Sequence, residues 1–204
     1  MPELPEVESI VRELRNRIIE ETIEDVRVYL KKMVRPGPRK FSQMIKGGRI
    51  REVDRLGKYI ILVLGRTRDP EPTYVVIHLK MTGQLLYRPK SQDRPDYVHV
   101  KICFKGKKEL LYRDMRQFGF LHGMVQAEYY KWKTEQDLGP DPYELNPQSF
   151  MELLRAKRGR IKPLLLNQRF IRGLGNIYVD ESLFAAGIHP LTPAITISEE
   201  QCVK

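Results

Sequence analysis

The sequence predicts an α+β protein with two domains: an antiparallel β-sandwich or barrel with flanking helices, followed by an all-α module. Three observations support this fold class. Short segments rich in β-branched and aromatic residues follow one another from residue 22 to residue 121, with glycine and proline turns between them. A proline-rich segment at 138–142 then interrupts the pattern. After it, the apolar residues recur at helical spacing.

An amphipathic helix is expected at the N-terminus. One apolar face is formed by Leu4, Val7, Ile10, Val11, Leu14 and Ile18. Pro5 suits the first helical position, where an N–H would be unpaired anyway. Glu6 and Glu8 favour the positive end of the helix dipole. The helix does not explain Pro2, which lies ahead of it.

Eight segments are predicted to be strands: 22–30, 50–53, 59–64, 74–79, 84–87, 97–104, 109–112 and 118–121. Strands at such short intervals favour antiparallel pairing over βαβ units. The segment 66–72 is expected to be a long hairpin loop without an assigned role.

The C-terminal part predicts four helices. Ser149 and Glu152 form a capping box for 150–157, which ends at Gly159. Helices are also expected at 162–168, at 177–186 with Asn176 as its cap, and after the capping box 198–201. The predicted divisions are a domain at 1–130, a linker at 131–148 and a domain at 149–204. Because the last helix is so short, we expect a chain cut short of its natural end.

Composition excludes several classes of protein. The chain has 204 residues, 41% of them hydrophobic, which is enough for a packed core. Its longest apolar run, 59–64, is too short to cross a bilayer, and acids and prolines stand where a signal peptide would begin. Cys103 and Cys202 are far apart, without a CxxC pair. They are expected to be buried or idle thiols in a reducing cytoplasm, not zinc ligands.

The net charge of +10 is unevenly distributed. Residues 1–26 carry −5 and residues 27–70 carry +10, while 155–172 holds seven basic side chains and no acid. Such clusters indicate either binding to a phosphate backbone or a solvated basic face. No basic amphipathic helix with an aromatic edge points to a membrane surface.

The turn Arg172-Gly173-Leu174-Gly175-Asn176 contains a GxG before a helix. A dinucleotide site is rejected because the preceding strand and the third glycine are missing. Either a tight helix–helix turn or a phosphate-binding helix N-terminus remains, and the neighbouring basic residues favour the second.

Five motifs together resemble bacterial formamidopyrimidine-DNA glycosylase. They are MPELPEVE at 1–8, LGKY at 56–59, HLKMTG at 78–83, DMRQFG at 114–119, and LNQ…GLGNIY…ESLFAAGIHP within 166–190. The resemblance covers essentially the whole chain in order. It implies a β-sandwich with flanking helices and then a helix–two-turns–helix module. It also implies base-excision repair of 8-oxoguanine and formamidopyrimidines in double-stranded DNA, with β,δ-elimination at the abasic site.

The resemblance assigns the chemistry to the N-terminus. Once Met1 is removed, the secondary amine of Pro2 is the nucleophile that attacks C1′ and forms an iminium ion. Glu3 is the acid–base partner, and Glu6 is a second carboxylate that orients rather than reacts. Lys58 is an active-site lysine that also contacts phosphate.

The remaining implied roles concern DNA. His78 and Asn176 contact phosphates, and Lys162 contacts the phosphate of the abasic site. Met81, Arg116 and Phe118 fill the space that an extruded nucleotide leaves. No metal-binding residue is expected.

The family normally continues into a loop over the flipped purine and a four-cysteine zinc finger. These 204 residues contain neither, so no cofactor is expected in this chain. The alternatives are a DNA-binding remnant, or an abasic-site lyase without efficient base excision. The sister enzyme endonuclease VIII, which prefers oxidised pyrimidines, is disfavoured by PELPEVE together with Met81, Arg116 and Phe118. A bacterial, cytoplasmic, nucleoid-associated monomer without membrane contact is expected.

Overall fold

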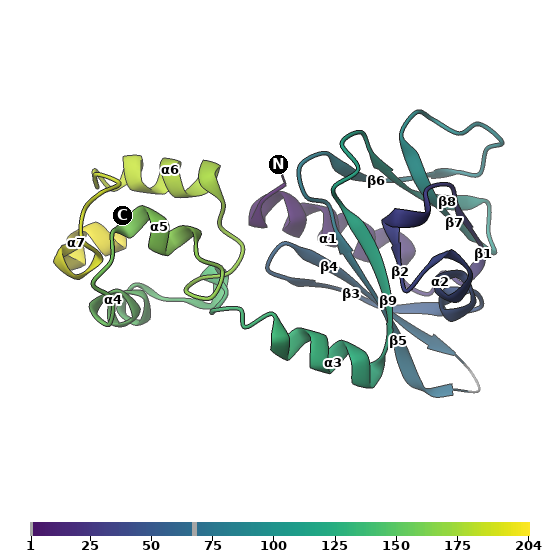
Figure 1. The fold of residues 1–204 in the computed structure, drawn as a ribbon, viewed down its shortest axis with the longest axis horizontal. Helices are drawn as coiled ribbons and strands as arrows, with labels where there is room; N and C mark the ends of the chain where they lie inside the picture. Colours follow the sequence, from purple (N-terminus) through teal and green to yellow (C-terminus); the bar gives the residue numbers. More distant parts are fainter. Residues whose placement is uncertain (1, 67–68) are drawn as a thin grey trace. The chain divides into compact units, whose positions relative to one another are not determined.

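Nine strands in two sheets form the first unit, Met1–Glu135, of the computed structural model, which describes residues 2–66 and 69–204 (Figure 1). The larger sheet has the order β2-β9-β5-β4-β3 and the smaller one β1-β7-β8-β6. The strands are β1 Ile23–Val28, β2 Val34–Arg35, β3 Arg49–Leu56, β4 Tyr59–Arg66, β5 Asp69–His78, β6 Gly83–Pro89, β7 Val98–Phe104, β8 Lys108–Asp114 and β9 Phe120–Val125. The antiparallel sandwich is confirmed. Among the described strands, only the two-residue β2 pairs in parallel, with β9.

At one end of the sandwich, two loops carry the chain from one sheet to the other, and we call them the crossing loops. The first joins β5 of the larger sheet to β6 of the smaller sheet, and the second joins β8 to β9 in the opposite direction. His78 pairs with Phe120 on the larger sheet, and Gly83 pairs with Asp114 on the smaller one. Because both ends of each loop are held in register, the segments 79–82 and 115–119 lie beside each other.

Helix α1 (Leu4–Ile18) packs its apolar face into the core between the sheets. Val7, Val11, Leu14 and Ile18 are buried, as the spacing predicts. The helix begins at Leu4, with Glu3 as its N-cap, so Pro5 occupies the second helical position instead of the predicted first. Helix α2 (Pro38–Ile45) packs against β1 and β9 and adds Phe41 and Ile45 to the core.

The second unit, Gln136–Lys204, is helical, as predicted. It contains η2 Pro142–Glu144, α4 Pro147–Arg155, α5 Ile161–Leu166, α6 Asn176–Ala185, η3 Ala194–Thr196 and α7 Glu199–Val203. Its own core includes Leu154, Ile161, Leu165, Val179 and Leu183.

Two predicted caps in this unit are wrong. Asn146, not Ser149, caps α4, and its Oδ1 accepts the Ser149 N–H at 2.8 Å. Gly175 is the N-cap of α6, so Asn176 is the first helical residue. The capping box of Ser198 and Gln201 on α7 is confirmed.

Two helices and one hairpin differ from the sequence prediction. Helices α2 and α3 (Gln126–Glu135) were not predicted; α3 mixes aromatic and charged residues without an apolar stripe. Strand β4 continues to Arg66 and β5 begins at Asp69, so most of the expected 66–72 loop is strand, and residues 67–68 lie outside the described residues. The predicted linker 131–148 includes the end of α3 and η2.

In residues 2–66 and 69–204, no helix combines the length and the apolar character that a bilayer span requires.

Replacing Phe41 with alanine tests the packing of α2 on the sandwich. Phe41 is fully buried, and its ring lies beside Gly123 of β9, where an added Cβ would approach the Phe41 Cδ2 to 3.1 Å. We expect Phe41→Ala to lower the free energy of unfolding by roughly 3–5 kcal/mol, because the cavity cannot close fully. The fluorescence of Trp132, the single tryptophan, reports unfolding of this unit. The exposed Val125→Ala on β9 is the control. Equal losses in both variants would contradict this packing.

Candidate functional site

The N-terminus is held by a capping box on α1. The Glu3 N–H donates to Glu6 Oε2 at 2.9 Å, and the Glu3 side chain accepts in return from the backbone of Glu6. The Glu3 side chain is almost completely buried, at 1% exposure, while Pro2 directly before it is partly exposed. The Glu6 carboxylate therefore fixes the backbone that carries Pro2 and Glu3.

Lys58 lies in the two-residue turn between β3 and β4. Gly57 precedes it with φ +57°, a conformation that glycine adopts without steric cost. Burial lowers the pKa of Lys58, the charge of Lys80 lowers it further, and the Glu3 carboxylate opposes both effects. Glu3, the predicted acid–base residue, and Lys58 are therefore close enough for the charge of Glu3 to influence the pKa of Lys58.

Arg55 ties this turn to α1. Its Nε donates to Glu8 Oε2 at 2.7 Å, and its guanidinium also donates to the Gly57 carbonyl at 3.2 Å. The Arg55 hydrogen bond lowers the pKa of Glu8 and is the largest influence on it. Because both side chains are largely buried, the pair fixes the Lys58 turn against the helix that begins at Glu3.

His78 ends β5 and lies between Tyr59 of β4 and Phe120 of β9. The Tyr59 ring meets the His78 ring edge-on, with the centroids 4.7 Å apart. Burial lowers the pKa of His78 to about 3, and the charges of Lys80 and Lys58 contribute. The Lys80 N–H donates to His78 Nδ1 at 2.9 Å, which places the ring proton on Nε2. His78 is therefore a neutral hydrogen-bond donor at physiological pH.

Met81, Arg116 and Phe118 lie on the two sheet-to-sheet loops. Met81 is 43% exposed and Phe118 55% exposed, so neither side chain is buried in the core. The Arg116 guanidinium carbon lies 4.9 Å from the centroid of the Phe118 ring. Phe118 is thus neither in the core nor in the strand that the sequence predicts for 118–121.

Pro2 and Met81 line the same hollow of about 380 Å³, together with the following residues of the first crossing loop and strand β6. Ile10 of α1 also lines it. The structure thus brings Pro2, the predicted nucleophile, to the same hollow as Met81, which is predicted to fill the space left by an extruded nucleotide.

Lys162 and Asn176 belong to the second unit. Lys162 Nζ lies 2.6 Å from Asp180 Oδ1, an ion pair between α5 and α6 that the sequence did not reveal. Asn176 is exposed in the first turn of α6. The Gln168 side chain shapes the turn before this helix: it accepts the Gly173 N–H at 2.9 Å and donates to the Leu174 carbonyl at 2.8 Å.

The basic stretch 155–172 divides into paired and unpaired side chains. Besides Lys162, Arg169 pairs with Asp137, and Arg172 pairs with the buried Asp141. The other four are exposed and form no ion pair within the described part of the chain: Arg155, Lys157, Arg158 and Arg160. The exposed positive charge of this unit therefore gathers around the connection between α4 and α5.

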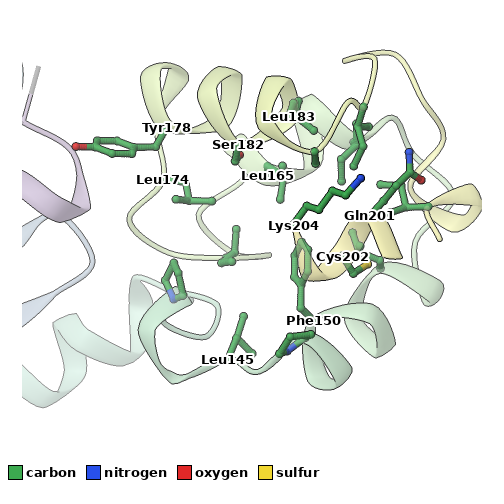
Figure 2. Close-up of a pocket in the computed structure, with 18 of the residues that line it drawn as sticks. Leu145, Phe150, Leu165, Leu174, Tyr178, Ser182, Leu183, Gln201, Cys202 and Lys204 are labelled. Atoms are coloured by element: carbon green, nitrogen blue, oxygen red, sulfur yellow. The ribbon is translucent and has the colours of Figure 1, made fainter. Parts of the chain in front are cut away.

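An apolar pocket of about 380 Å³ lies among α4, α5, α6 and α7. Figure 2 shows Phe150, Leu165, Leu174 and Leu183 around it, with Cys202 on the side of α7. All ten predicted site residues lie in the described part of the chain, and none of them lines this pocket. Also in residues 2–66 and 69–204, no group of three His, Cys, Asp or Glu side chains could hold a metal ion.

Sequence reasoning missed three contributors to the site: Tyr59 and Lys80, which contact His78, and Asp114, whose carboxylate accepts hydrogen bonds from both loops. All three stand inside the motifs LGKY, HLKMTG and DMRQFG. Their roles depend on which side chains are buried against which neighbours, and spacing along the chain does not carry that information.

The buried, neutral His78 predicts a specific dependence of stability on pH. The unfolded chain takes up a proton on this ring near pH 6.5, whereas the folded chain does so only near pH 3. The free energy of unfolding therefore falls as pH falls through this window, by at most about 1.4 kcal/mol per pH unit from His78 alone. Between pH 7 and pH 5, the wild type should lose about 2 kcal/mol more than His78→Asn.

Denaturant unfolding followed by Trp132 fluorescence measures this difference. His122→Asn on strand β9 is the control: burial lowers the pKa of His122 less than that of His78, so this variant should keep most of the wild-type dependence on pH. An identical pH profile in the wild type and His78→Asn would mean that the pKa of His78 is the same in the folded and the unfolded protein.

Comparison with known proteins places this geometry in a family. Residues 1–121 match the formamidopyrimidine-DNA glycosylase N-terminal domain, and residues 138–204 match the H2TH domain of the same enzymes. The Bacillus cereus formamidopyrimidine-DNA glycosylase is 40% identical over 206 residues, covering 98% of this chain and 72% of the relative. The Moorella thermoacetica enzyme is 37% identical, covering 100% of this chain and 74% of the relative.

Solved structures agree. The Lactococcus lactis Fpg in complex with DNA that contains an abasic site superimposes with a TM-score of 0.87 at 33% identity, covering 98% of this chain and 72% of that one. A complex of the same Fpg with DNA that contains FAPY-dG gives the same TM-score and identity, covering 74% of that chain. With both family domains matched in order along it, the chain belongs to the formamidopyrimidine-DNA glycosylase family of DNA repair enzymes.

Proposed function

We propose that this protein excises 8-oxoguanine and formamidopyrimidines from duplex DNA and cleaves the strand at the resulting abasic site. The observation that carries the proposal is the hollow shared by Pro2 and Met81, with Glu3 and Lys58 in one electrostatic environment beside it. The family and the DNA lesions held by the Lactococcus lactis neighbours support the substrate class.

The Pro2 amine begins the reaction once Met1 has been removed. Its nitrogen lone pair forms a bond to C1′ of the damaged nucleotide, and the glycosidic bond breaks with its electron pair leaving on the protonated base. The nitrogen then loses its N–H proton, its lone pair forms the C=N⁺ iminium as the C1′–O4′ bond breaks, and O4′ takes up a proton. Removal of a C2′ proton expels the 3′ phosphate, and a second elimination expels the 5′ phosphate. Water hydrolyses the remaining imine and returns the free amine.

The carboxylate and the lysine serve this sequence in different ways. Glu3, which is buried and held by its capping box, gives the proton to O4′ and receives protons later in this proposal. Lys58, whose pKa is lowered by burial, contacts the phosphate beside the lesion. The Nε2–H of neutral His78 donates a hydrogen bond to a phosphate oxygen.

The crossing loops keep the duplex open while the nucleotide is extruded. Met81 and Phe118 enter the space left in the stack, and Arg116 hydrogen-bonds the unpaired base opposite. In the second unit, Lys162 and Asn176 contact phosphates, with the exposed basic side chains around α4 and α5 adding attraction to the backbone.

Blocking the Pro2 nitrogen tests the nucleophile. Borohydride reduces an iminium to a stable amine, so protein without Met1 should become covalently attached to DNA carrying an abasic site. Protein that retains Met1, or carries an N-terminal tag, has an unreactive amide at Pro2 and should lose trapping by at least roughly a hundredfold. Lys58→Ala should slow trapping without abolishing it.

Gel electrophoresis of the reduced complex gives the readout, and an 8-oxoguanine duplex in parallel separates base excision from lyase activity. Full trapping by the tagged protein would remove Pro2 from the mechanism.

Truncating Phe118 tests the wedge. Phe118→Ala should weaken binding to a duplex with an abasic site roughly tenfold, because it removes an apolar contact made only when a nucleotide is out of the stack. Binding to the intact duplex should change less than twofold. Met115→Ala, a comparably exposed apolar residue of the same loop, is the matched control. Fluorescence anisotropy measures both affinities, and equal weakening on both duplexes would exclude insertion by Phe118.

A further inference from the structure

Asp114, at the end of β8, has a completely buried side chain that accepts hydrogen bonds from both crossing loops. Its Oδ1 accepts the Thr82 hydroxyl at 2.5 Å and the Arg116 N–H at 3.2 Å. Its Oδ2 accepts the Gly119 N–H at 2.8 Å. One carboxylate therefore joins the loop that carries Met81 to both ends of the loop that carries Arg116 and Phe118.

The same two loops contain backbone that needs external support. Lys80, directly before Met81, has φ +52°, and Gln117, between Arg116 and Phe118, has φ +58°. Left-handed conformations of non-glycine residues persist where surrounding contacts over-determine them. Hydrogen bonds to Asp114 from Arg116 and Gly119 flank Gln117, and the hydrogen bond from Thr82 follows Lys80 two residues later.

Close packing fixes the far end of the second loop. A Cβ at Gly119 would overlap the Tyr112 hydroxyl and lie 2.5 Å from the His78 carbonyl oxygen. Burial and the Asp114 charge raise the pKa of Tyr112, so its hydroxyl remains a neutral donor. Asp114 itself is anchored through its backbone: its carbonyl oxygen lies 2.7 Å from His99 Nε2, and its N–H donates to the Tyr97 carbonyl at 3.0 Å.

We propose that Asp114 is the positioning residue that sets Met81, Arg116 and Phe118 in one arrangement for insertion into DNA. The proposal rests on the proposed function, since it assigns the loops to nucleotide extrusion. Because its side chain is completely buried, Asp114 is assigned no contact with DNA or with the reacting atoms. It acts through the loop backbone, so that the exposed side chains meet the duplex without first paying the entropy of ordering their loops.

Removing the hydroxyl that bridges the loops is the sharpest variant. Thr82→Val keeps the shape of the side chain but loses both the donor to Asp114 and the acceptor of the Arg116 N–H, which is 3.0 Å from Thr82 Oγ1. The preference for an abasic-site duplex over an intact duplex should fall roughly tenfold, as expected for a lost hydrogen bond to a buried charge. Thr82→Ser restores the hydroxyl and should restore the preference. Asp114→Asn should behave like Thr82→Val.

Glu109→Gln is the control for a merely structural effect. Glu109 lies on the same strand, is equally buried, and pairs with Lys101 and Arg88, each at 2.9 Å, away from both loops. It should lower stability yet leave the preference within about twofold of wild type. Affinities for both duplexes are measured by fluorescence anisotropy, and stability by denaturant unfolding.

The outcomes separate the two proposals. A wild-type protein without preference for the abasic duplex, or without borohydride trapping, overturns the proposed function and this inference with it. A wild type that shows both, together with Thr82→Val that keeps the full preference, overturns the positioning role alone. A loss in Glu109→Gln as large as in Thr82→Val has the same meaning. If Asp114→Asn does not fold, the Thr82 pair decides the question.

Discussion

The whole site depends on the register of two strand pairs at one end of the sandwich. Pairing of His78 with Phe120 fixes where the chain leaves and re-enters the larger sheet, and pairing of Gly83 with Asp114 does the same for the smaller sheet. A shift of one residue in either pair would turn each side chain to the opposite face of its sheet. The loops would then present other residues than Met81, Arg116 and Phe118. With the strands in this register, the buried Asp114 carboxylate accepts hydrogen bonds from Thr82 on one loop and Gly119 on the other, and these bonds hold the loop conformation.

The proposed chemistry at this end of the sandwich depends on the burial of a few polar side chains and on the fixed backbone at Pro2 and Glu3. Glu3 is the N-cap of a helix whose apolar face lies in the core, so the position of Pro2 follows from the packing of α1. Arg55 and Glu8 bind the Lys58 turn to that helix. Burial lowers the pKa of His78 to about 3, so this ring is neutral at physiological pH, and burial also lowers the pKa of Lys58.

Much of the fold could be predicted from the sequence because its signals are local. The apolar spacing of α1, the alternation in the strands and the capping box of Ser198 all appear within a few residues. Helix α3 lacks such a signal: Tyr129 stacks on Tyr74, a contact between segments far apart in the chain. The cap of α4 was predicted wrongly for a different reason. Asn146 and Ser149 are both good capping residues, and only the backbone conformation shows that Asn146 is the cap.

The site residues were found through their motifs, and their roles remain predictions. What the motifs could not supply is environment. Nothing in the spacing shows that the Glu6 carboxylate accepts the Glu3 N–H, that Lys162 pairs with Asp180, or that Asp114 is fully buried. Each of these depends on a partner whose distance is set by tertiary packing, and each changes what the residue can do chemically.

The identity of the atom that bonds to DNA is the central claim, and mass spectrometry tests it directly. Protein without Met1 is reduced with borohydride on an abasic-site duplex, digested, and sequenced by fragmentation. The account predicts that the added sugar mass lies on the peptide beginning Pro2-Glu3-Leu4 and stays with the Pro2 fragment ion. Attachment to the peptide that contains Lys58, with the N-terminal peptide unmodified, would contradict it.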